Sequence, residues 1–99
     1  MKHQEFENAR ALFEAILQLQ NVEECTAFFD DLCTIKEIHD LAQRFEVAKM
    51  LDAGKSYQEI SGVTGASTAT ISRVCKALLY GSRGYRTILD RTQGEVSKQ

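Results

Sequence analysis

The sequence predicts an all-α protein of about six helices, and three features of its 99 residues support this fold class. The chain contains no proline, the residue that a helix interior tolerates least. Its apolar residues recur at three- and four-residue steps, which place side chains on one face of a helix, and no stretch alternates like a half-buried strand. Several Asn, Thr or Ser residues are followed three positions later by glutamate, which is the spacing of a helix N-terminal cap.

The first half of the chain predicts three helices. Two begin directly after the caps Asn21 and Thr34, whose matching glutamates are Glu24 and Glu37. The third helix is expected to end at Gly54, because glycine readily adopts the left-handed conformation that follows a helix. The helix before them carries an apolar stripe along one face. This stripe consists of Phe6, Ala9, Phe13, Ile16 and Leu17.

Residues 56–79 have the layout of a helix-turn-helix. Ser56 and Glu59 form a capping-box pair that starts a helix of about two turns. Gly65 permits the positive φ of a tight turn, and Ser67 is the expected N-cap of a second helix. A helix-turn-helix of this kind places its second helix in the major groove of DNA.

The second of these helices separates an apolar face from a polar one. At 100° per residue the apolar residues Ile71, Val74, Cys75 and Leu78 share one face. The opposite face is small, hydroxylated and basic, and such side chains suit close contact with base edges and phosphates. It presents Ala69, Arg73 and Lys76, flanked by Thr70, Ser72 and Ala77. The alternative is a structural helical hairpin whose polar face is merely solvated.

Charge is distributed unevenly along the chain. Residues 1–54 hold five Lys/Arg against eleven Asp/Glu, whereas residues 55–99 hold seven against three, although the net charge of the whole chain is only −2. A basic C-terminal half favours contact with phosphates. Arg83 and Arg86, in the glycine-containing segment after the helix-turn-helix, are therefore candidates for contacts to the DNA backbone, although solvated loop arginines would look the same.

We expect residues 1–91 to form a single domain, ending in a short helix over 85–91, with a polar tail over 92–99. The first half has more large apolar side chains than a small helical hairpin needs for support. We therefore expect residues 5–53 to supply a homodimer interface; the alternative is that these side chains fill an intramolecular core. A symmetric dimer would place two reading helices about one DNA turn, ~34 Å, apart.

Other classes of function find little support. Cys25, Cys33 and Cys75 lack metal-ligand spacing and are predicted to be small core residues, and neither His3 nor His39 has a second ligand at a suitable spacing, so no metal is expected. No apolar run approaches the ~20 residues of a membrane span, and no signal-like segment is present, so we expect a cytoplasmic protein. No catalytic motif is recognisable, so we expect neither enzyme activity nor a cofactor.

The stretch 32–78, centred on TIKEIHDLAQRFEVAKMLDAGKSYQEISGVTGASTATISRV, resembles the Trp repressor superfamily, and most closely its YerC/YecD-type branch. The most specific piece is GASTATISR, which matches the turn and the start of the family's reading helix. The resemblance implies an intertwined, all-helical homodimer that binds double-stranded DNA. It also implies that Ser67, Thr68, Ala69 and Ser72 face bases, and that Ser56 and Gln58 lie near the DNA backbone.

The family's named member represses transcription when tryptophan fills a pocket between the dimerisation core and the reading helix. Two arginines of that pocket have counterparts here, Arg44 and Arg73. The tryptophan-binding pattern continues with a glycine and a serine, but this chain has Val74 and Ala77. Val74 adds bulk and Ala77 lacks a hydroxyl for the amino group, so we do not expect tryptophan binding.

The sequence therefore predicts a sequence-specific DNA-binding regulator of the repressor type that acts as a homodimer without tryptophan. It leaves open an unidentified small-molecule effector. The alternative is a protein-binding adaptor that keeps the helix-turn-helix shape.

Overall fold

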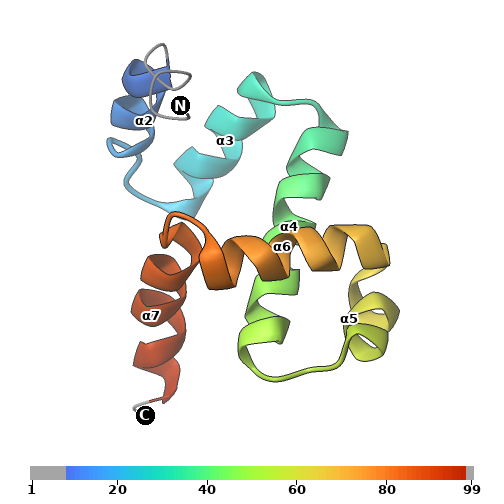
Figure 1. The fold of residues 1–99 in the computed structure, drawn as a ribbon. Helices are drawn as coiled ribbons and strands as arrows, with labels where there is room; N and C mark the ends of the chain where they lie inside the picture. The colour runs from blue at the N-terminus through green and yellow to red at the C-terminus, as the bar shows by residue number, and fades with distance from the viewer. Residues whose placement is uncertain (1–8, 98–99) are drawn as a thin grey trace. The chain divides into compact units, whose positions relative to one another are not determined.

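The structure is a computed structural model that describes residues 9–97, with side chains described for residues 9–93. These residues form an all-α fold, as predicted, and contain no strand. Six α-helices follow one another along the chain (Figure 1). They are α2 (Arg10–Ile16), α3 (Val22–Leu32), α4 (Ile35–Asp52), α5 (Tyr57–Thr64), α6 (Thr68–Tyr80) and α7 (Gly84–Ser97).

The predicted helix starts in the first half are confirmed by their hydrogen bonds. The Glu24 backbone N–H donates to the Asn21 side chain at 2.8 Å. At the start of α4, Thr34 and Glu37 form a reciprocal pair, with distances of 2.8 and 3.1 Å. After α4, Gly54 adopts a φ of 82°, the left-handed geometry that glycine was expected to provide.

The described residues divide into two compact units, the first ending at Ile38 and the second beginning at His39. The first unit contains α2 and α3, neither of which buries a described side chain. Leu17 is 80% exposed and Val22 is 74% exposed. The core placement expected for the cysteines is therefore wrong, because Cys25 is exposed and the other two are only half-buried. Phe6, which begins the predicted N-terminal stripe, lies outside the described residues.

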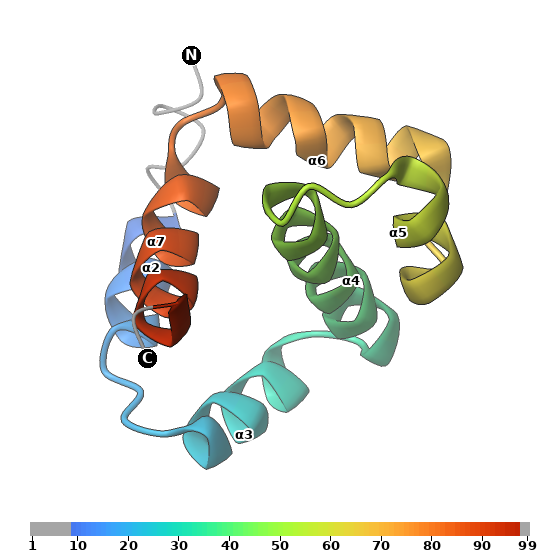
Figure 2. The ribbon, with the colours of Figure 1, turned by 90° about the horizontal axis from the view of Figure 1, so that it is seen from below.

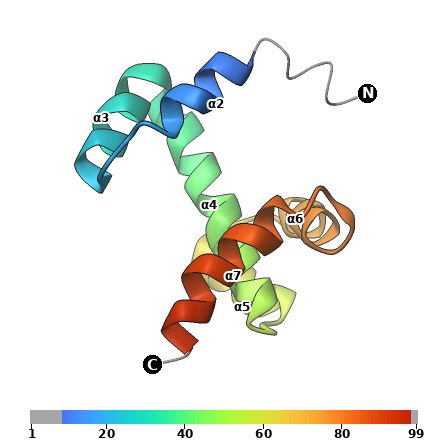
Figure 3. The same cartoon turned by 90° about the vertical axis from the view of Figure 1, so that its left-hand side faces the viewer.

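The second unit holds all of the fully buried apolar side chains found in the described part of the chain. In Figures 2 and 3, α5, α6 and α7 surround the C-terminal half of α4. Ile71 and Val74 lie in this core, so the predicted inward face of α6 is confirmed. The core consists of Val47, Ala48, Ile60, Ala66, Ile71, Val74 and Leu89, each at most 2% exposed.

The last helix is longer than predicted. It begins at Gly84 and reaches Ser97, so it includes residues 92–97 of the expected polar tail. Polar side chains sustain the helix here: Arg86 pairs with Asp90 one turn later, and the Thr92 hydroxyl donates to the Ile88 carbonyl at 2.8 Å. Polar composition did not prevent helix formation, because four-residue spacing lets polar groups stabilise each other or the helix backbone.

Candidate nucleic-acid interface

The first helix of the motif, α5, starts at a complete capping box. The Glu59 N–H donates to Ser56 Oγ at 3.1 Å, and the Ser56 N–H donates to Glu59 Oε1 at 3.0 Å. These hydrogen bonds from Ser56 lower the pKa of the Glu59 carboxyl, because they favour its charged form. Ser56 and Gln58 are both exposed at this end of the motif.

The turn between α5 and α6 is fixed by two threonine contacts and one glycine. Thr64 Oγ1 donates to the Ile60 carbonyl at 2.7 Å and accepts from the Ala66 N–H at 3.1 Å. Gly65 has a φ of 75°, which places it in the left-handed region where a side chain would be strained. Gln43 of α4 also reaches the turn, and its Nε2 donates to the Thr64 carbonyl at 3.0 Å. The turn is thereby held to the helix behind it.

The second helix, α6, begins at Ser67, as expected. Ser67 Oγ accepts from the Thr70 N–H at 3.1 Å and also lies 3.1 Å from Thr70 Oγ1. Thr70 is half-buried and takes part in this cap, whereas Thr68 and Ala69 are exposed. The first turn of α6 therefore presents small side chains to solvent.

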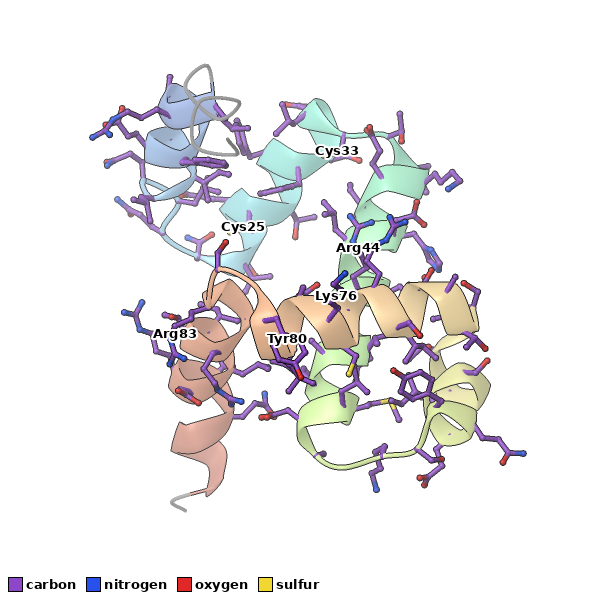
Figure 4. The ribbon with its side chains drawn as sticks, in the orientation of Figure 1. Cys25, Cys33, Arg44, Lys76, Tyr80 and Arg83 are labelled. Atoms are coloured by element: carbon purple, nitrogen blue, oxygen red, sulfur yellow. The ribbon has the colours of Figure 1, made fainter. Side chains whose placement is uncertain are left out.

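The exposed stripe of α6 continues through its basic residues. Ser72, Arg73 and Lys76 are exposed, and neither Arg73 nor Lys76 forms an ion pair with another described residue. Tyr80 follows one turn after Lys76 and is 81% exposed. The sequence reasoning missed Tyr80, although one more helical turn at 100° per residue places it on the same stripe. Figure 4 shows Lys76, Tyr80 and Arg83 along the C-terminal half of α6 and the connection to α7.

The two arginines that follow α6 differ in their surroundings. Arg83 is exposed, with a φ of 68°, and precedes α7. Arg86 instead donates to Asp52 at 2.8 and 3.0 Å and pairs with Asp90 at 2.8 Å. The Arg86 hydrogen bonds lower the pKa of the Asp52 carboxyl. The phosphate contact expected of Arg86 therefore needs correction, because two carboxylates already neutralise this guanidinium.

The counterparts of the tryptophan pocket occupy α4 and α6. Arg44 is half-buried on α4, and Arg73 is exposed on α6. Val74 is only 2% exposed, so its branched side chain is part of the core at the position where the tryptophan-binding pattern has glycine. Ala77 is exposed and offers no hydrogen-bonding group.

Comparison with known proteins identifies the family. The family model described as Trp repressor protein matches residues 7–93. The chain belongs to the Trp repressor family. It is 58% identical over 82 residues to the uncharacterized protein YerC of Bacillus subtilis (strain 168), an alignment that covers 83% of this chain and 79% of YerC.

Two solved structures of Trp repressor type also match the fold. One is a candidate Trp repressor from Staphylococcus aureus, with 52% identity and a TM-score of 0.83. The other is a TrpR-like protein from Eubacterium eligens ATCC 27750, with 49% identity and a TM-score of 0.86. Each match covers 89% of this chain and 93% of the other. The predicted resemblance to the Trp repressor family is thus confirmed over most of the chain.

Two further searches concern other kinds of site. Among residues 9–97, no three His, Cys, Asp or Glu side chains are grouped so that they could hold a metal ion. No described helix is both long and apolar enough to cross a membrane.

Proposed function

We propose that the chain is a homodimeric, sequence-specific DNA-binding transcriptional regulator of the repressor type, with α6 in the major groove. The observation that carries this proposal is the exposed face of α6. This face combines small residues at the start of the helix with two cations that form no ion pair with a described residue. Small side chains permit a close approach to the bases, and arginine or lysine can reach guanine or a phosphate.

Each predicted residue has a place in this interface. Ser67, Thr68, Ala69 and Ser72 would lie at the base edges, with Thr70 beside them. Arg73 and Lys76 would reach guanine O6 and N7 or a phosphate. Ser56, Gln58 and Arg83 would lie along the DNA backbone. Arg86 is left out, because its hydrogen bonds to Asp52 and Asp90 occupy it within the protein.

Dimerisation is the part of the proposal that concerns the first unit. Its two described helices bury no side chain, and several large apolar residues of the first half are exposed. Association with a second copy would remove this surface from water and contribute about 25 cal/mol for each Å² of apolar area buried. The most exposed of these residues are Leu17, Val22 and Ile35.

We also propose that DNA binding does not depend on tryptophan. Val74 occupies core volume on the reading helix, and Ala77 lacks the hydroxyl that would accept from an ammonium group. A buried ammonium without its partner costs more than a neutral group would. Any effector would therefore differ from tryptophan.

The experiment that tests the proposal is selection of genomic fragments by the purified protein without added ligand, followed by binding measurements across a salt series. We expect a short two-fold-symmetric site. We also expect affinity to fall with salt at a log–log slope near −0.9 for each phosphate neutralised. No enriched site, together with capture of a protein partner at salt-independent affinity, would favour the adaptor function instead.

A further inference from the structure

A hollow of about 330 Å³ lies between α4 and α5, within the second unit. Its volume falls in the range of small-molecule pockets. The α4 side chains recur at the three- and four-residue steps of one helix face, and the α5 side chains are the last two of that helix. The hollow is lined by His39, Ala42, Gln43, Glu46, Val63 and Thr64.

This hollow differs from the pocket that the tryptophan-binding pattern would use. The family counterparts Arg44 and Arg73 do not line it, and no residue of α6 does. It lies instead between α4 and α5, two helices that Figure 2 shows beside one another. A ligand in this place would contact the first helix of the motif and the helix behind it.

The lining residues favour an amine over an acid. Glu46 supplies a carboxylate, and the hollow has no lysine or arginine in its lining. An anionic ligand would therefore meet a like charge, whereas an ammonium would meet an opposite one. Lys49 lies 3.2 Å from Glu46 Oε1, which shows that this carboxylate accepts an ammonium and leaves Oε2 for a second one.

The hollow also has an apolar wall. Val63 is 71% exposed, and Ala42 lies across from it on α4 among the lining residues. A short branched or aromatic group would cover the Val63 side chain, and the removal of that surface from water would add to affinity. The ligand class that fits both features is a small primary amine with a short apolar group.

The position of the hollow connects it to the turn of the helix-turn-helix. Gln43, which lines it, donates to the carbonyl of Thr64, which also lines it. Thr64 in turn holds Ala66 through its hydroxyl, and Gly65 makes the turn itself. A ligand between Gln43 and Val63 would contact the same residues that fix the angle between α5 and α6.

We propose that the α4–α5 hollow is a binding site for a small primary amine, held by the Glu46 carboxylate and by the exposed side chain of Val63. The site acts on the turn that precedes α6. This binding needs no DNA, so its test is independent of the proposed function.

The test is an NMR titration of the isotope-labelled full chain with isobutylamine and with benzylamine. We expect saturable shifts of the backbone amides of Val63, Thr64 and Gly65. The acid analogues isobutyrate and benzoate should produce no saturable shift. Glu46→Gln should weaken amine binding at least tenfold. Glu23→Gln removes another exposed carboxylate, on α3, and should leave binding unchanged.

Circular dichroism of each variant checks that its helices are intact, and Val63→Ser gives a second variant that leaves the carboxylate in place. Val63→Ser should weaken benzylamine more than ammonium chloride, because only benzylamine has an apolar group to bury. The proposal is overturned if neither amine gives saturable shifts, if the acids bind equally, or if Glu46→Gln binds as well as Glu23→Gln.

Discussion

The Arg86 guanidinium donates to both carboxylate oxygens of Asp52, at 2.8 and 3.0 Å, across 34 residues of chain. This pair joins the last residue of α4 to the first turn of α7. Leu89, three residues after Arg86, is fully buried in the core. The ion pair therefore fixes the position of α7 at the point where that helix enters the core.

Asp52→Asn should lower the melting temperature at pH 7 by a few degrees, because the amide retains the shape of the carboxylate but loses its charge. The pKa of Asp52 is lowered from 3.8 in the folded protein. Its stabilising contribution is therefore complete well above pH 3.8 and is lost as the pH falls through the lower, folded value. Thermal unfolding of the two proteins from pH 7 to pH 2 should show their melting temperatures converging below about pH 4.

Asp90→Asn is the matched control for this prediction. Asp90 pairs with the same guanidinium, but its side chain is 62% exposed against 29% for Asp52. Solvent screens the exposed pair more strongly, so its loss should change the melting temperature less. Equal effects of the two substitutions would contradict the role assigned to the bidentate pair.

The DNA-facing side of α6 can be separated from its core side by substitution. Arg73→Ala and Lys76→Ala should each weaken specific DNA binding by ~1–3 kcal/mol if they reach bases. Both side chains are exposed, so the melting temperature should change little. Ile71→Ala should do the reverse and cost ~2–5 kcal/mol of folding stability, because Ile71 is fully buried. Fluorescence anisotropy and chemical denaturation measure the two effects.

A charge-matched control for the DNA measurement is Arg10→Ala, on α2 of the first unit. Arg10 forms an exposed pair with Glu14 and should leave DNA affinity unchanged apart from the general effect of one positive charge. Loss of folding in Arg73→Ala and Lys76→Ala as large as that in Ile71→Ala would mean that α6 faces the other way.

Two glycines of the motif should respond oppositely to alanine. Gly65 has a φ of 75°, so Gly65→Ala forces a side chain into the left-handed region and should cost ~1–2 kcal/mol. Gly62 lies within α5, and a Cβ there would have nothing within 4 Å. Gly62→Ala should therefore stabilise the protein by roughly 0.5–1 kcal/mol. Urea denaturation distinguishes the two; a stabilised Gly65→Ala variant would show that the turn relaxes without glycine.

The sequence predicted those parts of the molecule that depend on short-range patterns. Capping boxes such as that of Ser56 and Glu59 involve residues three apart, and the buried side of α6 follows from helical periodicity. Arg86 was misassigned because its partner Asp52 lies 34 residues away, and no local pattern pairs them. The bond from Gln43 to the Thr64 carbonyl was missed for the same reason, since 21 residues separate them. Both depend on tertiary packing.

Tryptophan should not bind this protein measurably at concentrations up to about 1 mM, which corresponds to a binding free energy weaker than about −4 kcal/mol. Val74 is 2% exposed and fills the volume beside the reading helix, and Ala77 cannot accept a hydrogen bond from an ammonium group. An ammonium buried without that partner would lose ~1–3 kcal/mol or more. Isothermal titration calorimetry should give only the heat of dilution. Ala77→Ser restores the hydroxyl alone and should remain silent, because Val74 still occupies the space. A tryptophan dissociation constant below about 1 mM for the unmodified chain would show that Val74 moves aside, and the argument from both residues would fail.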